Sequence, residues 1–154
     1  MSPEPVRRQR FSAYALVHRD GPGGTEVLLT QLSGTTTRPG AWTLPGGGVE
    51  HGEDPYDAVV REVGEETGLT LTVVRLLDVH SLHVEGVAPD GVLEDYHAIR
   101  LVFEGTVAPD APEPRVLEVN GTTAEARWVP RDEVVGDSDS MVGLVGWALE
   151  AADR

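Results

Sequence analysis

Residues 47–69 read GGVEHGEDPYDAVVREVGEETGL, and they predict a loop, one helix and a second loop. Asp54-Pro55 is typical of an N-cap followed by proline in the first helical turn, and Gly68 is typical of the left-handed residue that ends a helix. We therefore expect a helix over residues 55–67. Five of its side chains recur every three or four residues and are expected to face the core: Tyr56, Val59, Val60, Val63 and Thr67.

The other face of the predicted helix is acidic, because Glu62, Glu65 and Glu66 stand at positions i, i+3 and i+4. Like charges at this spacing destabilise an isolated helix by about 0.2–0.5 kcal/mol per pair. Arg61 can pair with Glu65 one turn on, but one guanidinium cannot neutralise three carboxylates. A solvated surface is one interpretation. A divalent cation is the other, because Mg²⁺ favours carboxylate oxygens and water and is usually shared with substrate phosphates.

The rest of the chain alternates apolar segments with turn signals rich in glycine, proline and aspartate. Strands are expected at residues 11–18, 25–32, 70–83, 96–107 and 122–129. Residues 42–45 are expected to be extended and to lead into three consecutive glycines. Two more helices are expected, a short one at 131–135 and a terminal one at 138–152.

The spacing within residues 47–69 resembles the Nudix box, G-x5-E-x7-R-E-U-x-E-E-x-G-U with U aliphatic, at every specified position. The preceding segment WTLPGG, residues 42–47, is also similar to the family's usual approach to the box. The resemblance implies an α/β (α+β) fold, a Nudix-type α/β/α sandwich with a central mixed β-sheet. It also implies a Mg²⁺-dependent pyrophosphohydrolase, a hydrolase acting on phosphorus-containing acid anhydrides.

The same resemblance implies roles for the box residues. Glu62, Glu65 and Glu66 would hold Mg²⁺, for which Mn²⁺ may substitute, and Gly47 belongs to this metal-binding set. Glu53 would complete or orient the carboxylates, and Arg61 would pair with box glutamates and fix their geometry. Water would then attack phosphorus, with the metal polarising the phosphoryl oxygens.

The resemblance leaves the general base open, since some family members use a box glutamate and others a glutamate on a later loop. Glu62 or Glu53 is the first choice, and Glu113 and Glu118 are the loop candidates. The MutT branch places an extra metal-binding Glu before a Gly at a position where this chain has Asn120-Gly121. That glutamate therefore has no direct counterpart here.

Three residues are candidates for substrate binding: Arg38, His51 and Glu118. Arg38 lies in the loop ahead of the box, where it can contact a phosphate or a base or can simply solubilise the loop. His51 lies close to Glu53 in the variable part of the box and is a phosphate contact or an ordinary exposed turn residue.

We expect a nucleoside diphosphate linked to another moiety as the substrate, with (d)NTP or oxidised (d)NTP cleaved to NMP and pyrophosphate. Hydrolysis of ADP-ribose, nucleotide sugars or dinucleoside polyphosphates is the alternative, although residues 84–87 lack the Pro or Tyr that marks the ADP-ribose and dinucleoside polyphosphate branches. The rival from another class is a nucleotide-sensing Nudix module without turnover.

The length, charge and cysteine content of the chain limit its domain number, partners and kinds of metal site. A chain of 154 residues fits one domain, and we expect a flexible leader at residues 1–10 and a single domain at 11–154. The formal charge of −14 disfavours polymeric nucleic acid and membrane surfaces as partners. The absence of cysteine excludes disulfides and thiolate metal sites. A cytoplasmic protein that binds a small nucleotide derivative, with a homodimer as the default, is the expectation.

Overall fold

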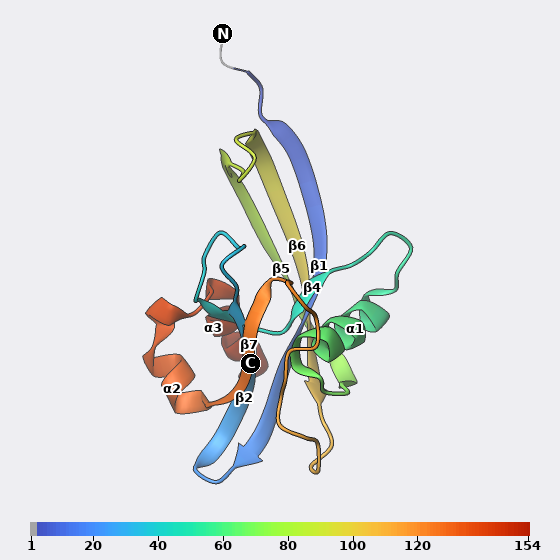
Figure 1. The fold of residues 1–154 in the computed structure, drawn as a ribbon, viewed down its shortest axis with the longest axis vertical. Coiled ribbons are helices and arrows are strands. Elements are labelled where there is room, and N and C mark those ends of the chain that lie inside the picture. The colour runs from blue at the N-terminus through green and yellow to red at the C-terminus, as the bar shows by residue number, and fades with distance from the viewer. Residues whose placement is uncertain (1–2) are drawn as a thin grey trace.

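A computed structural model describes residues 3–154 as a mixed sheet between helices (Figure 1). The sheet has seven strands: β1 (Val6–Gly21), β2 (Gly24–Leu32), β3 (Trp42–Thr43), β4 (Gly46–Gly48), β5 (Thr72–Val87), β6 (Leu93–Thr106) and β7 (Thr123–Pro130). The helical elements are α1 (Pro55–Thr67), α2 (Arg131–Gly136), the short 3-10 helix η1 (Ser138–Ser140) and α3 (Gly143–Ala152).

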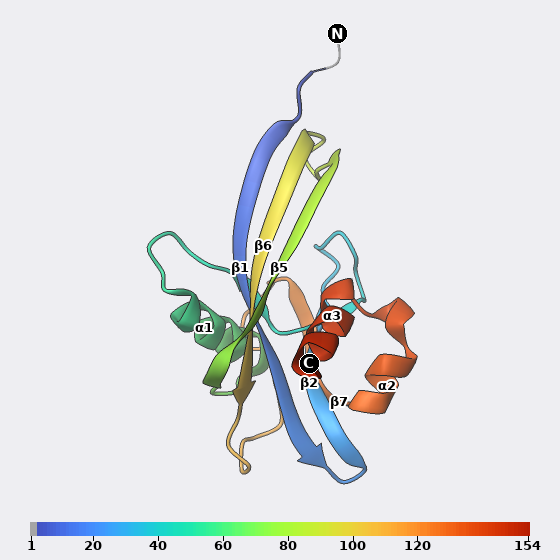
Figure 2. The ribbon, with the colours of Figure 1, turned by 180° about the vertical axis from the view of Figure 1, so that it is seen from behind.

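The sheet is mixed because β1 runs parallel to β6, whereas the other strand pairs are antiparallel. Its main order is β3-β2-β1-β6-β5, with β4 beside β1 and β7 beside β2. The helix α1 covers one face, and α2 and α3 lie on the opposite side (Figures 1 and 2). The expected α/β/α sandwich with a central mixed sheet is therefore confirmed.

Each face of the sheet contributes to its own apolar core. Under α1, the buried side chains include Val59, Val63 and Phe103. Under α3, they include Leu16, Val102 and other aliphatic residues. Since α1 is fixed to the sheet by this packing, its remaining polar side chains have a defined position relative to β4 and β7.

The helix α1 spans the predicted residues, because its end signals are local. Asp54 accepts a hydrogen bond from the backbone N–H of Tyr56 at 2.8 Å, and Gly68 has φ 71° and donates to the carbonyl of Gly64 at 2.9 Å. Pro55 occupies the first turn, where its missing N–H costs nothing.

The predicted buried stripe of α1 is only partly right. Val59, Val63 and Thr67 are fully buried. Tyr56 and Val60 were wrongly expected in the core, since they are 50% and 38% exposed. Ala58 and Glu66 take their place, because the contact line runs through positions 58/59, 63 and 66/67 of the helix.

The first strand begins at Val6, so the expected leader at residues 1–10 is wrong for residues 6–10. Residues 7–10 are polar, but residues 6–10 all pair in parallel with β6 from Val6↔Glu94 onward, and this pairing satisfies the backbone groups on the side that faces β6. Met1 and Ser2 lie outside the described residues. The outer parts of β1, β5 and β6, residues 6–11, 82–87 and 93–98, extend beyond the helices and form what we call the arm (Figure 2).

The C-terminal segment differs from the single helix expected at residues 138–152. It forms η1 and then α3, and the two are separated by an extended turn in which Met141 bridges to Trp42 of β3. Val142 donates to the carbonyl of Trp42 at 2.8 Å, and this sheet-like contact interrupts the helix. No helix within residues 3–154 combines the length and the apolar character needed to cross a membrane.

Candidate active site

Arg61 organises the acidic face of α1. Its Nε and Nη2 atoms donate to the two carboxylate oxygens of Glu53 at 2.8 and 2.9 Å. Its Nη1 atom lies 3.1 Å from Glu62 and 3.3 Å from Glu65. Nη2 also donates to the carbonyl of Gly48 at 3.1 Å. One guanidinium thus ties the loop before α1, the strand β4 and the helix together.

This pairing perturbs the ionisation of Glu53 and Arg61. The hydrogen bonds from Arg61 lower the pKa of Glu53 from 4.5 to about 2. The same contact with Glu53 raises the pKa of Arg61 above its usual value. Glu53 is therefore a fixed anion, and both of its oxygens are already occupied by donors.

Glu66 is the buried member of the acidic set, with 4% of its surface exposed. Its Oε1 accepts a hydrogen bond from the backbone N–H of Gly46 at 2.7 Å, and its Oε2 accepts one from the hydroxyl of Thr123 on β7. Burial raises the pKa of Glu66 to about 8, and the charges of Glu62 and Glu118 add to the rise. Burial also raises the pKa of Glu62.

The glycines of β4 permit the helix to approach this closely. Gly46 has φ 154°, and a Cβ atom there would lie 2.3 Å from the carbonyl oxygen of Ala13. A Cβ atom on Gly47 would lie 2.7 Å from the carboxyl carbon of Glu62. Any larger residue at these two positions would push β4 away from β1 or displace the Glu62 carboxylate.

A loop distant in sequence caps the C-terminal end of α1. The carbonyl of Glu65 accepts hydrogen bonds from the N–H groups of Leu117 and Glu118 at 2.9 and 3.0 Å, and the carbonyl of Thr67 accepts one from Arg115 at 2.7 Å. These are carbonyls that the helix itself leaves unpaired. The capping places Glu118 close enough to Glu62 and Glu66 to raise the pKa of both.

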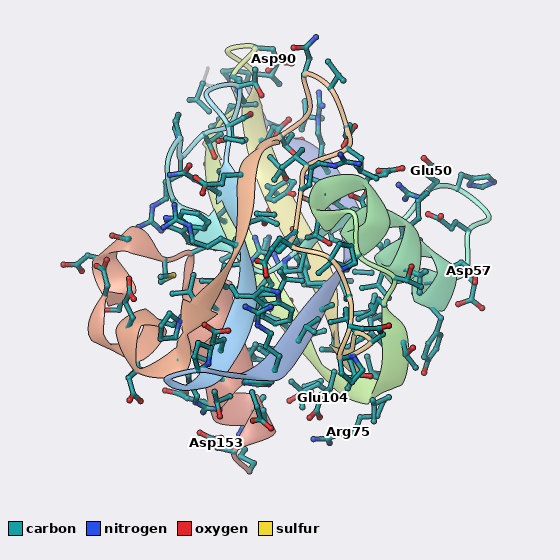
Figure 3. The ribbon with its side chains drawn as sticks, turned by 60° about the horizontal axis from the view of Figure 1, so that its bottom comes forward. Glu50, Asp57, Arg75, Asp90, Glu104 and Asp153 are labelled. Carbon is teal, nitrogen blue, oxygen red and sulfur yellow. The ribbon has the colours of Figure 1, made fainter. Side chains whose placement is uncertain are left out.

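A cavity of about 680 Å³ opens beside these carboxylates. Gly46, Gly47 and Glu66 line one part of it, and residues of the arm and of the loop ahead of β3 line much of the rest. In contrast, Glu50 and Asp57 point outward on the far side of α1, and Asp90 lies at the tip of the arm (Figure 3). The acidic residues near the cavity are thus a distinct group within a strongly acidic chain.

The model of the NUDIX domain family matches residues 8–143. The chain belongs to the Nudix family. It is 31% identical to nucleoside triphosphatase NudI of Escherichia fergusonii over 129 residues, which cover 81% of this chain and 85% of that protein. It also resembles the MutT protein of Methanosarcina mazei, with a TM-score of 0.70, 26% identity, and 99% and 97% of the two chains covered.

Some curated Nudix relatives are much longer than the stretch they share with this chain. A nudix hydrolase of Caenorhabditis elegans is 47% identical over 76 residues, which are 49% of this chain but only 20% of that protein. The matched part therefore spans about a fifth of that relative, and its share of Nudix hydrolase 25 of Arabidopsis thaliana is similarly small, 18%.

The structure brings together the Nudix-box residues that the sequence singled out. Glu53, Glu62 and Glu65 surround Arg61, and Glu66 and Gly47 lie where α1 meets β4. Glu118, from the later loop, joins this group through the capping contacts.

The other candidates lie elsewhere or have other partners. Arg38 lines the cavity, but its guanidinium donates to the carbonyls of Met141 at 2.9 Å and Asp139 at 2.6 Å. His51 is exposed in the loop before α1 and does not line the cavity. Glu113 has an 85% exposed side chain and lies 3.8 Å from Arg19.

The acidic group fits a hard divalent cation that is shared with substrate. Within residues 3–154, no three His, Cys, Asp or Glu side chains form a ready-made metal cluster. Arg61 is shared among Glu53, Glu62 and Glu65, and Glu66 has no basic partner within residues 3–154. Burial raises the pKa of Glu62 and Glu66, so these two carboxylates would gain most from a further positive charge. Mg²⁺ is usually held by one or two carboxylates plus water and substrate phosphates, which is the kind of set these two residues provide.

Sequence reasoning missed several residues around the site. Thr123 holds Glu66, and Tyr14, Arg10 and Arg100 line the cavity. None of them stands in a local motif. Only the pairing of distant strands places them next to the Nudix box, and a single sequence carries no signal of that pairing.

Proposed function

We propose that this Nudix chain is a divalent-metal-dependent hydrolase that cleaves the phosphoanhydride bond of a nucleoside diphosphate derivative. The observation that carries the proposal is the pair Glu62 and Glu66. Glu66 is buried and Glu62 is half-buried, and this loss of solvent together with neighbouring carboxylates raises the pKa of both. Glu66 also lies in the wall of a cavity large enough for a nucleotide. A cation bound with an anionic substrate would relieve this excess negative charge.

Each residue has a defined part in the proposal. Glu62 and Glu66 would hold Mg²⁺ or Mn²⁺, with Glu65 beside them, and the Glu53–Arg61 pair keeps their geometry. A bound divalent ion would polarise the phosphoryl oxygens and lower the pKa of the attacking water. Gly46 and Thr123 orient Glu66 through their hydrogen bonds.

Glu118 is the general base in this proposal. Glu53 is a poor proton acceptor, because Arg61 occupies both of its oxygens and lowers its pKa to about 2. Glu118 has an exposed side chain, is anchored at the end of α1, and lies within electrostatic reach of Glu62 and Glu66. Its carboxylate accepts the proton that the water loses as it attacks phosphorus.

The preferred substrates in the proposal are nucleoside triphosphates and their oxidised forms, cleaved to NMP and pyrophosphate. The similarity to a protein named nucleoside triphosphatase over most of both chains supports this choice. ADP-ribose, nucleotide sugars and dinucleoside polyphosphates are the second group to test. Location in the cytoplasm and assembly as a homodimer stay predictions.

A substrate panel with Mg²⁺ or Mn²⁺ tests the proposal. We expect turnover of at least one nucleotide, no turnover with chelator, and loss of turnover in Glu66→Gln. Glu118→Gln should lower kcat by about 100-fold or more, whereas Glu113→Gln, on the same loop but beside Arg19, should leave it unchanged. Metal-dependent nucleotide binding without product release from any substrate would contradict the hydrolase and favour a sensor.

A further inference from the structure

Two arginines outside the Nudix box share one face of the sheet inside the cavity. In the register of β1 and β6, Arg10 lies opposite Ala98, and Ser12 lies opposite Arg100. Because side chains alternate along a strand, Arg10 and Arg100 project from the same face of the sheet. Both line the cavity that also contains Glu66, Gly46 and Gly47.

Neither arginine has an acidic partner among the described residues. Seven of the twelve basic residues of the chain form ion pairs, but Arg10 and Arg100 form none within residues 3–154. Glu94, which lines the same cavity, is already paired with Arg8 at 2.8 Å. Arg38, the third arginine that lines the cavity, also forms no ion pair, but it donates to two backbone carbonyls. Within residues 3–154, Arg10 and Arg100 have neither kind of partner, which is a marked local exception in a chain with a formal charge of −14.

The positions of the two guanidiniums connect them to the acidic site. The guanidinium of Arg10 lies over Gly48, where a Cβ atom would be 3.3 Å from its Nη2, and Gly48 follows Gly47 of the Nudix box. Tyr14 lines the same cavity, and all three charged groups act on its hydroxyl. Burial raises the pKa of Tyr14, the charges of Arg100 and Arg10 oppose that rise, and the charge of Glu66 adds to it. The cations and the buried carboxylate therefore act on the same part of the cavity.

Free guanidiniums at this place suit a phosphate better than a neutral group. An arginine offers forked N–H donors that match phosphate oxygens, and its hydrogen bonds to an anion are charge-assisted. The carboxylates would engage phosphate only through a divalent cation, and that ion would supply the positive charge at the anhydride that is cleaved. Arg61, the basic residue of the Nudix helix, is occupied by Glu53, Glu62 and Glu65, so a further phosphate needs a cation elsewhere.

We infer that Arg10 and Arg100 form a phosphate-binding pair that takes a third phosphate of the substrate, next to the two that the metal would hold. The chain would then discriminate in favour of substrates with at least three consecutive phosphates and against nucleotide sugars and ADP-ribose, which have two. This inference rests on the proposed function, since it concerns the substrate class of the same site.

Steady-state kinetics of Arg10→Gln, Arg100→Gln and the double variant test this inference. Each single substitution should lower kcat/KM for a nucleoside triphosphate by about 10- to 100-fold, the loss of one or two charge-assisted hydrogen bonds. The same variants should change kcat/KM for ADP-ribose by less than about threefold. Arg7→Gln is the matched control, because Arg7 also forms no ion pair but lies on the other face of β1. Equal losses for both substrates, or no loss for either, would overturn the inference.

A binding measurement separates the failure of this inference from that of the proposed hydrolysis. Calorimetry with Mg²⁺ and either inorganic tripolyphosphate or pyrophosphate needs no turnover. The wild type should bind tripolyphosphate more tightly, and the double variant should lose most of that preference. If no substrate is hydrolysed but this preference is present and depends on the arginines, the phosphate pair stands and the hydrolase proposal fails. If wild type and double variant show the same preference, the pair is rejected whatever the activity.

Discussion

Arg61 shows how one side chain can determine the geometry of a whole acidic surface. Its three nitrogen atoms contact Glu53, Glu62 and Glu65 and the carbonyl of Gly48. A lysine has the same charge but a single nitrogen, so it cannot reproduce the forked contact with Glu53 while also reaching Glu62. The charge of the site would be kept and its geometry lost.

We therefore predict that Arg61→Lys folds but lowers kcat by about 10- to 100-fold, the usual effect of displacing reacting groups by about 1 Å. Steady-state kinetics on the best substrate of the panel measure this, with circular dichroism as a check of folding. Arg127→Lys is the control, since Arg127 forms an exposed pair with Glu125 at 2.8 Å on β7 and contacts none of the Nudix-box glutamates. An unchanged kcat in Arg61→Lys would show that charge alone is sufficient.

The raised pKa of Glu66 predicts that the free energy of unfolding of the metal-free protein depends on pH. Burial raises its pKa from 4.5 to about 8 on folding, so between these values the folded state holds a proton that the unfolded state has lost. Its contribution to stability is complete below pH 4.5 and decreases as the pH rises toward 8, with a slope of up to about 1.4 kcal/mol per pH unit.

Urea unfolding at pH 5 to 8 in the presence of chelator measures this slope. Glu66→Gln should remove it, because the amide has no proton to lose. The difference between wild type and variant isolates Glu66 from His18 and His80, whose lowered pKa values act in the opposite direction. The same pH profile in wild type and variant would rule out this contribution of Glu66.

At the scale of elements, the end of α1 combines a helix stop with the placement of Glu118. Gly68 has φ 71°, and a Cβ atom there would lie 3.0 Å from the carbonyl oxygen of Arg115 in the capping loop. We predict that Gly68→Ala lowers the free energy of unfolding by about 1–2 kcal/mol, the cost of a left-handed non-glycine residue. It should also lower kcat, because the displaced loop carries Glu118.

Gly64→Ala provides the matched comparison within the same helix. A Cβ atom at Gly64 meets no atom within 4 Å, so the substitution should stabilise the protein by about 0.5–1 kcal/mol through helix propensity alone. Denaturant unfolding of both variants measures the two effects. A destabilisation of equal size in both would show that the left-handed conformation of Gly68 is not the cause.

The same helix shows how much of this molecule can be predicted from sequence. Its ends at Pro55 and Thr67 were predicted correctly because the N-cap, the proline and the terminal glycine act within a few residues. The start of β1 at Val6 was not predicted, because this mostly polar segment becomes a strand only by pairing with β6. The burial of Glu66 was missed as well, because its partners Gly46 and Thr123 come from two separate strands.

At the scale of the whole molecule, charge and topology act together. The chain carries a formal charge of −14, which on average repels any phosphate compound. The fold counters this repulsion locally, because the parallel pairing of β1 with β6 brings Arg10 and Arg100 into the cavity beside the Nudix helix. In the proposed function, Glu62 and Glu66 would bind a cation before an anionic substrate approaches them, because the pKa of both carboxyl groups is raised.

The excess negative charge at Glu62 and Glu66 predicts that Mg²⁺ specifically stabilises the folded protein. A ligand that binds only the folded state at 100 times its Kd adds about 2.7 kcal/mol, and each kcal/mol raises the Tm of a chain of this size by about 2–4 °C. We expect MgCl₂ to raise the Tm of the wild type well beyond NaCl of equal ionic strength, which only screens the net charge. The double variant Glu62→Gln/Glu66→Gln should respond equally to both salts, because general screening persists when the site is removed. Equal responses in the wild type would mean that Mg²⁺ only screens the chain, and the acidic face of α1 would then be a solvated surface.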